Sequence, residues 1–425
     1  MLRRQFLQTL ALSSGMLLPL SRNAFAIRAA GTNENSPTQK KLIVIMLRGA
    51  VDGLNVVAPV ADNNYARLRP NIHLNRPGAE NGAINLDGYF GLHPALADLQ
   101  PLWNDKKLAF IHASGSPDTT RSHFDAQDYM ETATPGRKST QDGWMNRLLG
   151  GLPGDQYPTR SLAIGPVMPR ILTGAAVSTT LASGAAGTRA TLLDNPAIGN
   201  AFDKMYEGKA GYSKQYQDAK TAHKDIMSAS VDKSGSMEKT SMDKVEMNAS
   251  NGAPLPNGFP GDASRLATLM KNDPKIQMAF IALGGWDTHV NQGAGTGKLA
   301  NLLTPLGKGL ATLCKQLDTL FDDCTIVVMS EFGRTVRENG TNGTDHGHGN
   351  VMWVMGGKVA GGKVHGRWSG IDGSGLYEGR DLAVTTDFRT VLANVAERHM
   401  GLSDAQLAAV FPAMPKSDGK LALYA

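Results

Sequence analysis

The sequence predicts an α/β fold in which helices cover both faces of a mostly parallel sheet. Continuous apolar runs of strand length occur at residues 42–47 and 325–329, and such runs are typical of strands that are buried on both faces. Leucines recur at steps of three and four residues between 299 and 320, which indicates a long amphipathic helix. Strands and helices of this kind alternate along the chain, and that order is typical of parallel sheets.

The first 26 residues have the features of an export signal. Arg3 and Arg4 precede an apolar run at 10–20, and Ala24-Phe25-Ala26 has the small-x-small form of a cleavage site. The alternative is a membrane anchor, but a spanning helix needs about 20 apolar residues, and the run at 10–20 is shorter than that. We therefore predict a twin-arginine signal at 1–26, contact with the twin-arginine translocon during export, a periplasmic or extracellular mature protein, and no stable membrane span after cleavage.

The mature chain is predicted to begin with a flexible polar leader at 27–40, followed by one α/β domain at 41–425. Three arginines of the chain lie in the signal, so the formal charge of the mature chain is +5 − 3 = +2. This near balance, without a dense run of Lys and Arg, argues against a nucleic-acid partner. Cys314 and Cys324 are the two cysteines. They are expected either to form a disulfide in an oxidising compartment or to remain buried thiols.

The first predicted strand, at 42–47, leads into a glycine-rich loop at 48–55 that carries one carboxylate, Asp52. A short helical pattern follows at 94–103. The next strand is expected at 108–112. Each of these strands therefore ends in a loop that can carry polar groups.

The polar loop at 113–121 follows the second strand and leads into a helix. Residues 122–125 have the form Ser-x-x-Asp, which can cap the start of a helix reciprocally. The helix is predicted to continue through Met130. Its first residues, Ser122 and His123, are therefore expected close to the end of a strand.

The middle of the chain carries no assigned chemistry. Short strands and loops are expected between 150 and 200, where Gly, Ala, Thr and Ser are frequent. From about 204 to 251 the composition shifts to Lys, Asp, Ser, Met and Gln. This polar insertion is expected to be either a solvated helical cap or a mobile segment.

Regular structure is predicted again in the second half of the domain. A helix is expected at 263–270, followed by a strand at 276–283. Pro305 is expected either to kink the long leucine-rich helix or to begin a second helix behind a Thr304 cap. Closing helices are predicted after the strand at 325–329, with the bounds 388–400 and 405–411.

Carboxylates and imidazoles follow directly after several of these strands. Because ligands of parallel sheets bind beyond the carboxyl ends of the strands, these side chains are expected to share one edge. Such a set suits a divalent metal, namely zinc or manganese, or calcium or magnesium where oxygens dominate. The predicted ligands are Asp52, Asp287, His289, Glu331, His346 and His348.

Two alternatives to a metal site remain open. The Asp-x-His pair at 287–289 has a spacing that is also common in a hydrogen-bonded turn. The glycine-rich run at 345–348 is also compatible with a solvated surface loop. His93 and His399, which lack clustered partners, are interpreted as structural.

Ser122 is the predicted nucleophile, because a hydroxyl at a helix start lies at the positive end of the helix dipole. Thr119 and Thr120 compete with it. Arg121 or Arg334 is predicted to hold two oxygens of a phosphate or sulfate. His123 is expected either to face the site or to pack against the core.

Five motifs resemble one known family. They are Arg-Gly-x-x-Asp-Gly-Leu-Asn at 48–55, Thr-Arg-Ser-His-Phe-Asp-Ala-Gln-Asp at 120–128, Gly-Gly-Trp-Asp-Thr-His at 284–289, Ser-Glu-Phe-Gly-Arg-Thr at 330–335 and Asp-His-Gly-His-Gly at 345–349. Together with the twin-arginine leader, they resemble the bacterial exported family of unknown function numbered 1501. That family is grouped with the alkaline phosphatase and sulfatase superfamily, so the resemblance implies an alkaline-phosphatase-like α/β fold.

The resemblance also implies roles for single residues. Asp52 matches the first metal-binding aspartate of the superfamily, and Ser122 most nearly matches the nucleophile. Asp287 and His289 match one metal-binding couple, Glu331 matches the acid of a second couple, and His346 or His348 matches the last ligand. The second couple departs from the pattern, because Phe332 stands where a histidine is expected.

These features predict an exported metal-dependent hydrolase of phosphate or sulfate esters, whose substrate is an anionic ester or glycan. The alternative is a non-catalytic periplasmic or surface factor for binding or assembly that keeps the same fold. A redox function is disfavoured, because the two cysteines are not accompanied by a cofactor motif.

Overall fold

The computed structural model describes residues 39–184, 187, 191–208, 211–230, 244–415 and 421–424. The predicted signal at 1–26 and most of the predicted leader lie outside these residues. Within the described ranges, no helix combines the length and the apolar character that crossing a membrane requires.

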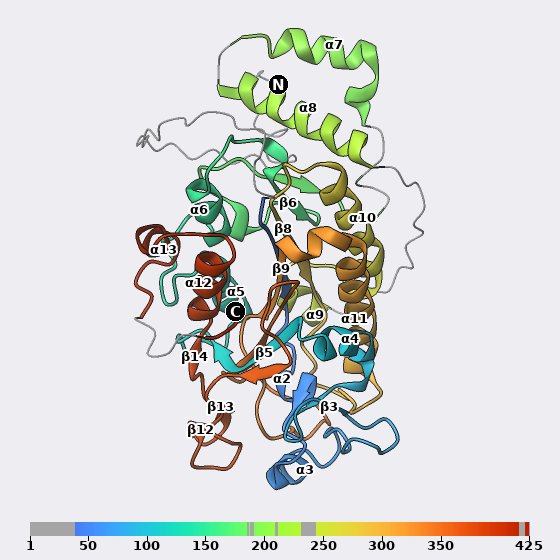
Figure 1. Cartoon of the computed structure of the whole chain (residues 1–425), viewed down its shortest axis with the longest axis vertical. Coiled ribbons are helices and arrows are strands. Elements are labelled where there is room, and N and C mark those ends of the chain that lie inside the picture. The colour runs from blue at the N-terminus through green and yellow to red at the C-terminus, as the bar shows by residue number, and fades with distance from the viewer. Residues whose placement is uncertain are drawn as a thin grey trace.

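A single large sheet forms the centre of the fold (Figure 1). Its strands, in order across the sheet, are β11 (Lys363–His365), β5 (Leu108–Gly115), β10 (Asn350–Gly356), β9 (Cys324–Ser330), β1 (Lys41–Leu47), β8 (Met278–Leu283), β6 (Ser161–Ile164) and β7 (Thr179–Leu181), with β14 (Thr386–Asp387) beside β5. β10 is antiparallel to both of its neighbours, whereas the other pairs in this sheet are parallel. The predicted α/β class with a mostly parallel sheet is confirmed.

Helices cover both faces of this sheet, as Figure 1 shows. β1 explains why, because its side chains alternate between two apolar clusters: Ile43 and Ile45 belong to one, and Val44 and Met46 to the other. The first face carries α10 (Phe259–Asn272), α11 (Lys298–Leu317), η1 (Pro94–Leu99) and α4 (Gln100–Asn104). The second face carries α5 (His123–Thr132), α6 (Trp144–Gly151), α12 (Phe388–Arg398) and α13 (Asp404–Val410).

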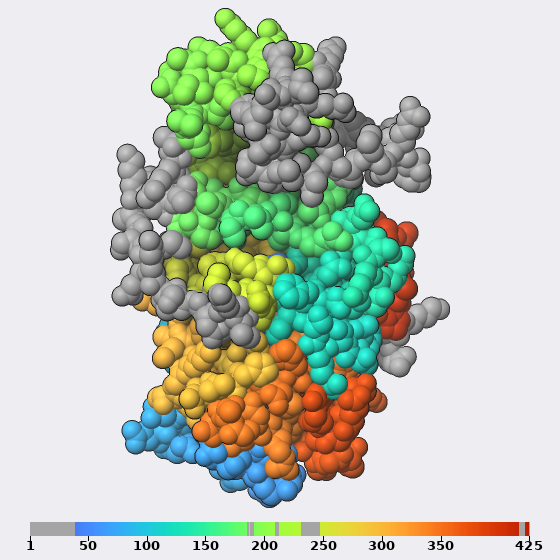
Figure 2. Space-filling model, turned by 180° about the vertical axis from the view of Figure 1, so that it is seen from behind, coloured from blue at the N-terminus to red at the C-terminus, as the bar shows by residue number. Residues whose placement is uncertain are grey.

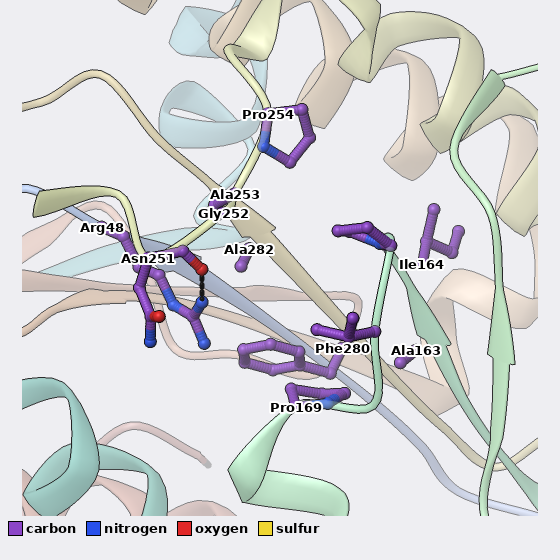
Figure 3. Close-up of a pocket in the computed structure, with 13 residues that line it drawn as sticks. Arg48, Ala163, Ile164, Pro169, Asn251, Gly252, Ala253, Pro254, Phe280 and Ala282 are labelled. Atoms are coloured by element: carbon purple, nitrogen blue, oxygen red, sulfur yellow. Dashed lines mark hydrogen bonds between the residues drawn. The ribbon is translucent and has the colours of Figure 1, made fainter. Parts of the chain in front are cut away.

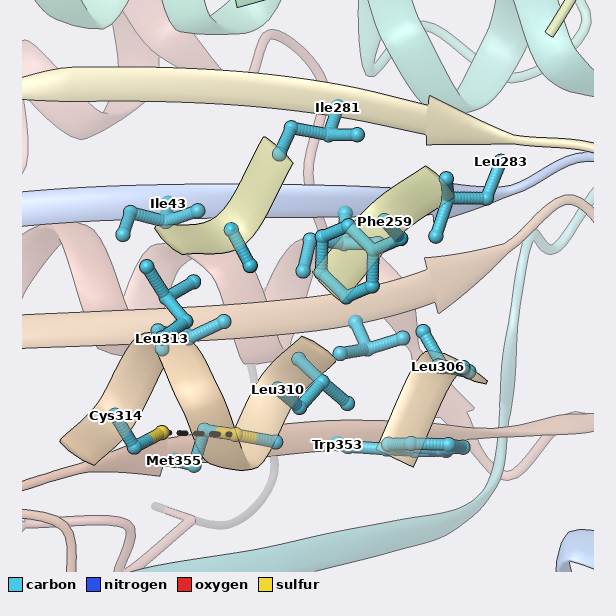
Figure 4. Close-up of a cluster of buried hydrophobic side chains, with 14 of the residues drawn as sticks. Ile43, Phe259, Ile281, Leu283, Leu306, Leu310, Leu313, Cys314, Trp353 and Met355 are labelled. Atoms are coloured by element: carbon cyan, nitrogen blue, oxygen red, sulfur yellow. Dashed lines mark hydrogen bonds between the residues drawn. The ribbon is translucent and has the colours of Figure 1, made fainter. Parts of the chain in front are cut away.

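α11 is the predicted leucine-rich helix. Leu306, Leu310 and Leu313 are fully buried and pack on the sheet beside Phe259 of α10 (Figure 4). Pro305 lies inside this one helix, and the Thr304 hydroxyl donates to the Ala300 carbonyl within it. Thr304 therefore does not cap a second helix. The chain after α11 continues as the 3-10 helix η7 (Asp318–Asp323).

The two cysteines are free thiols, and both are buried. Cys314 Sγ lies 3.8 Å from Met355 Sδ in the core. Burial raises the pKa of the Cys324 thiol to about 12. Of the two expectations, the buried thiols are the arrangement that the structure has.

The described part of the polar insertion is helical. It comprises the end of α7 (Pro196–Met205), α8 (Gly211–Ala229) and α9 (Lys244–Ala249). α8 packs against η2 (Pro158–Arg160), which directly precedes β6. α7 and α8 therefore lie beyond the amino ends of the strands, at the top of Figure 1, and the rear view in Figure 2 shows the same separation from the blue and orange segments at the other end.

Short elements complete the fold. They are α2 (Gly53–Val56), β2 (Val57–Ala58), α3 (Asn63–Leu68), β3 (Ile84–Asn85), β4 (Gly91–Leu92), η3 (Arg170–Leu172), η5 (Leu192–Asp194), η6 (Pro256–Gly258), β12 (Leu376–Tyr377) and β13 (Asp381–Leu382). β12 and β13 pair as an antiparallel hairpin.

Candidate metal centre

Segments that follow different strands meet at the carboxyl-end edge of the central sheet. His123 is the first residue of α5, which follows β5, and Asp287 and His289 follow β8. His346 lies in the loop between β9 and β10. Because β10 runs antiparallel to β9, the start of β10 lies at the same edge as the end of β9. The topology therefore brings these side chains together from distant parts of the chain.

The ring nitrogens and one carboxylate oxygen of these residues form a tight cluster. His346 Nε2 lies 3.0 Å from His123 Nε2, 3.1 Å from His289 Nε2 and 3.2 Å from Asp287 Oδ1. Asp287 Oδ1 lies 3.0 Å from His289 Nε2 and 3.5 Å from His123 Nε2. Ligand atoms around a tetrahedral zinc ion are about 3.3 Å apart, given bonds of about 2.0 Å. These contacts have the spacing of such a ligand set.

The other nitrogen of each imidazole fixes its tautomer. Each Nδ1 contacts an oxygen that only accepts hydrogen bonds: Glu331 Oε1 at 2.8 Å for His123, Asp345 Oδ1 at 3.2 Å for His289, and the Arg121 carbonyl at 2.9 Å for His346. Each Nδ1 therefore carries the proton, and each Nε2 of a neutral ring presents a lone pair. When all three rings are neutral, their Nε2 lone pairs and the Asp287 carboxylate oxygen face one another with no proton of their own between them. This donor set fits a divalent cation.

Carboxylates around the cluster shift the protonation of its members. Burial alone would lower the pKa of His123, but contacts with Asp287 and Glu331 raise it to about 9. Burial alone would raise the pKa of Asp287, but the three imidazoles and Arg334 hold it far below its ordinary value. Without a cation, the cluster therefore takes up a proton on an imidazole, and metal binding would release that proton.

Glycines allow the two motif loops to run backbone to backbone. The Gly333 amide donates to the His348 carbonyl, and the Gly347 amide donates to the Gly333 carbonyl, both at 2.8 Å. A Cβ atom at Gly333 would lie 1.8 Å from the Gly349 carbonyl oxygen, and one at Gly347 would lie 2.4 Å from the Arg334 carbonyl carbon. Larger residues would push the loops apart, so the glycines hold His346 beside the residues that follow β8.

Arg334 supports the cluster and does not match its predicted role as a substrate clamp. It is 1% exposed. Its Nη2 donates to Asp287 Oδ1 at 2.5 Å, and its Nε donates to the Ala50 carbonyl at 2.6 Å. Its Nη1 donates to the Thr344 carbonyl. Because its donors are already bound inside the protein, Arg334 orients Asp287 and does not reach a substrate.

Asp52 lies outside the cluster, and its predicted role as a metal ligand does not fit its surroundings. The Arg69 guanidinium contacts both carboxylate oxygens, at 2.5 and 3.1 Å, and Gln292 donates to one of them at 2.7 Å. Both Asp52 and Arg69 are fully buried. The carboxylate is therefore neutralised by a guanidinium and hydrogen-bonded within the protein.

Glu331 lies behind His123 and is not itself a ligand in this arrangement. Its Oε1 accepts from the Gly49 amide at 2.7 Å, from His123 at 2.8 Å and from Gln127 at 3.0 Å. Burial would raise its pKa, but hydrogen bonds from His123 and Gln127 lower it. Glu331 is thus an ionised acceptor that orients the His123 ring.

His348 packs outside the cluster. Its ring centroid lies 4.7 Å from that of Tyr377, and burial lowers its pKa. Of the two candidate late histidines, His346 is the one whose ring nitrogen joins the other ligand atoms. His348 contributes its backbone carbonyl to the contact with Gly333.

Ser122 and Arg121 lie beside the cluster without joining it. Ser122 is exposed and precedes α5, and its side chain makes no capping hydrogen bond. Arg121 donates to Glu378 Oε2 and to Asp381 Oδ2, both at 2.7 Å. Ser122, the predicted nucleophile, thus directly precedes His123 of the cluster.

Phe332 forms an apolar wall of the centre. It is 3% exposed, and its ring centroid lies 4.9 Å from that of His123 and 5.1 Å from that of His346. At the position where a histidine was expected, the Phe332 ring therefore packs against two imidazoles of the cluster. Within the part of the chain that the structure describes, one group of three or more ligand atoms lies mutually close, and it consists of His123, Asp287 and His346. His289 is outside this group, and it joins the cluster through its Nε2 contacts with Asp287 at 3.0 Å and His346 at 3.1 Å.

Sequence reasoning did not identify the partners that orient the imidazoles. Asp345 belongs to the Asp-His-Gly-His-Gly motif, so its proximity to histidines was a usable signal. No sequence pattern could identify the Arg121 carbonyl as the acceptor for His346, because every residue carries a backbone carbonyl. Asp381, which binds Arg121, was also missed, since its partner is 260 residues away.

An apolar pocket lies apart from this cluster (Figure 3). Ile164, Pro169 and Phe280 line it, and Arg48 stands at its edge. Arg48 donates to the Asn251 carbonyl at 3.0 Å and to Glu131 at 2.5 Å. Its cationic side chain is thus already paired with a carboxylate of the protein.

Comparison with models of known protein families gives one match for this chain. Residues 103–411 match the model of the family described as a protein of unknown function, DUF1501. The chain belongs to the DUF1501 family. The DUF1501 match includes the four residues of the cluster, His123, Asp287, His289 and His346. No curated protein sequence matches the chain.

The solved structures that are similar to this DUF1501 protein include a protein of the alkaline phosphatase superfamily, a sulfatase and a lipoteichoic acid synthase. A protein of that superfamily from Vibrio parahaemolyticus has 12% identity and a TM-score of 0.39, with 78% of this chain and 64% of that chain covered. The PsFucS1 sulfatase from Pseudoalteromonas sp. has 13% identity and a TM-score of 0.38, with 86% and 68% covered. The lipoteichoic acid synthase LtaP from Listeria monocytogenes has 10% identity and a TM-score of 0.34, with 86% and 73% covered. The chain spans less than two thirds of the Vibrio protein, and at these identities the similarity concerns the fold alone.

Proposed function

We propose that this protein binds one divalent metal ion through His123, Asp287, His289 and His346, and that it hydrolyses phosphate or sulfate esters outside the cytoplasm. The observation that supports the metal is the set of Nε2 lone pairs that face Asp287 Oδ1 at 3.0 to 3.5 Å. Nitrogen ligands outnumber oxygen ligands in this set. It therefore favours zinc over manganese, and both over calcium and magnesium.

The chain's own residues supply further parts of a hydrolytic site. A bound divalent ion would act as a Lewis acid and neutralise charge that develops on an ester. Ser122 offers an exposed hydroxyl at the start of α5, where the helix dipole favours negative charge. Side chains of His289 and His346 are 34% and 25% exposed, so solvent reaches the cluster from their side. An anionic ester or glycan is the proposed substrate class.

The metal and the reaction are tested on the same purified mature protein. Elemental analysis is expected to find about one metal ion per chain, because Phe332 and the Asp52–Arg69 pair leave the predicted second ligand set incomplete. Hydrolysis of p-nitrophenyl phosphate and p-nitrophenyl sulfate is then measured with and without a chelator. We expect the chelator to abolish turnover and added zinc to restore it.

Variants separate the metal from the nucleophile. His346→Ala is expected to lose both metal and activity, whereas His348→Ala, the matched control outside the cluster, keeps both. Ser122→Ala is expected to keep the metal and to lower kcat by about 100-fold or more. Wild-type protein without metal after zinc loading would refute the metal proposal. Full activity in Ser122→Ala would refute the role of that hydroxyl.

The second candidate is a non-catalytic binding factor with a metal-stabilised centre. The burial of Arg334 and the pairing of Asp52 with Arg69 favour it, because the hydrolase hypothesis had assigned Arg334 to substrate binding and Asp52 to the metal. It predicts stoichiometric metal but no hydrolysis of aryl, sugar or glycan phosphate and sulfate esters. The same panel of substrates therefore decides between the two candidates.

A further inference from the structure

We propose that Asp381 is a positioning residue for the ligand His346, and that the β12–β13 hairpin thereby sets the metal affinity of the centre. This inference rests on the metal part of the proposed function and is independent of the reaction. It concerns a carboxylate that lies outside the group of ligand atoms and that no sequence motif singled out.

Four residues form a closed circuit of hydrogen bonds around His346. The His346 Nδ1 donates to the Arg121 carbonyl at 2.9 Å, and Arg121 Nη2 donates to Asp381 Oδ2 at 2.7 Å. On the other side, Arg380 Nη2 donates to the same Asp381 oxygen at 2.9 Å and to the His346 carbonyl at 2.8 Å. Asp381 therefore connects the residue that fixes the ring of His346 with the residue that fixes its backbone.

Burial makes Asp381 the dominant member of this circuit. Asp381 is fully buried, whereas the side chains of Arg121 and Arg380 are 31% and 44% exposed. Removing its charge would leave two guanidinium groups close together without the negative charge that both contact, and a buried pair broken in this way is costly. The arginines would then separate and release their hold on His346.

The hairpin is also joined to the two loops that build the centre. Asp381 forms an antiparallel bridge with Thr335, and the Leu382 carbonyl accepts from the Gly349 amide at 2.7 Å. These contacts place β13 beside the residues that follow Arg334 and beside those that follow His346. A shift of the hairpin would therefore be transmitted to both loops.

Glu378 is a natural control for the charge of Asp381. It accepts from the same Arg121 Nη2 at the same distance of 2.7 Å, but its side chain is 54% exposed. Exposed ion pairs contribute little because solvent screens them. Replacing Glu378 changes the net charge by the same amount as replacing Asp381, without opening the buried circuit.

The test measures metal affinity in the metal-stripped mature protein. Dissociation constants for Zn²⁺ and Co²⁺ are obtained by competition with a chromophoric chelator, and the visible absorption of bound Co²⁺ reports its ligand geometry. Asp381→Asn is expected to bind both ions about 10 to 100 times more weakly and to show an altered Co²⁺ spectrum. Glu378→Gln is expected to change affinity by less than about 3-fold and to keep the spectrum.

Two results would overturn the inference: wild-type affinity and spectrum in Asp381→Asn, or an equal loss in Glu378→Gln. If Asp381→Asn does not fold, Arg380→Met replaces it, because this half-exposed side chain tolerates substitution and its removal opens the circuit at the His346 carbonyl. Unchanged Co²⁺ absorption in Arg380→Met would then overturn the inference. Wild-type protein that binds neither ion would refute this inference together with the metal proposal, whereas wild-type binding with unaffected variants would refute this inference alone.

Discussion

Glu331 shows how one buried carboxylate can orient a proposed metal ligand without being a ligand itself. It is fully buried, and its Oε1 accepts from His123 Nδ1 at 2.8 Å. This hydrogen bond holds the proton on Nδ1, so that Nε2 presents its lone pair to the cluster. A carboxylate behind a histidine ligand also makes the ring a stronger donor.

The variant Glu331→Gln tests this role. Its amide oxygen can still accept from Gly49 and His123, and its NH₂ group can face the Ser330 hydroxyl that now lies 3.0 Å from Oε2. The fold is therefore expected to persist, while the zinc dissociation constant rises about 10- to 100-fold. Zinc titration against a chelator measures the change. Glu397→Gln, at a half-buried position on α12 outside the cluster, is the control, and an unchanged dissociation constant in Glu331→Gln would contradict the proposed role.

At the residue scale, the sequence predicted which groups share an edge better than it predicted what each group does. Asp287 and His289 were predicted from their position after a strand, a rule that depends on topology alone, and His346 from the paired histidines of its glycine-rich loop. Asp52 obeys the same rule but is paired with Arg69. Arg334 lies in a specific motif but is turned inward to Asp287. The choice of partner depends on tertiary packing, which no local pattern encodes.

At the element scale, α11 was predicted well because its leucines repeat along one face. Pro305 is tolerated within it for a reason that the repeat does not reveal. The proline removes the donor to the Asn301 carbonyl, and Asn301 lies on the exposed side of the helix, where water can supply the missing hydrogen bond. The direction of β10 was not predicted either, because an apolar run reads the same in both directions.

Leu310→Ala tests how much the buried face of α11 contributes to stability. Leu310 is fully buried in the apolar cluster that α11 and α10 form on one face of the sheet (Figure 4). Truncating such a leucine is expected to lower the free energy of unfolding by about 2–5 kcal/mol. Lys308→Ala, on the exposed face of the same helix, is expected to stay within about 0.5 kcal/mol. Equilibrium unfolding in urea measures both, and equal effects would show that the packing of this face does not dominate.

At the scale of the whole molecule, three buried histidines away from the cluster connect stability to pH. His93, His112 and His399 are 0%, 1% and 5% exposed. Each ring contacts a backbone carbonyl through Nε2, at 2.9, 2.8 and 2.9 Å respectively. Burial lowers the pKa of each to about 4, despite these contacts. Two of them, His93 and His399, were predicted to be structural because they lack clustered partners.

These histidines predict that the protein loses stability as the pH falls from about 6.5 to about 4. Above about pH 6.5, these three rings are neutral in both the folded and the unfolded chain, so they cause no loss of stability there. Between these limits the unfolded chain binds the additional protons, and each histidine removes up to about 3 kcal/mol by pH 4. Below pH 4 the rings are protonated in both states, and these groups cause no further loss.

Urea unfolding of the metal-stripped protein at about pH 7.5, 6 and 4.5 measures this dependence. His123, whose pKa is raised to about 9, is protonated in the folded state throughout the acidic part of this range. It therefore adds little to the loss between pH 6.5 and 4. His399→Asn keeps an amide donor for the Lys41 carbonyl but removes one titrating ring, so its unfolding free energy should fall less steeply with pH than that of the wild type. A wild-type stability that stays constant from pH 7.5 to 4.5 would mean that the unfolded chain gains no protons over the folded one, and that the buried rings are charged in the fold.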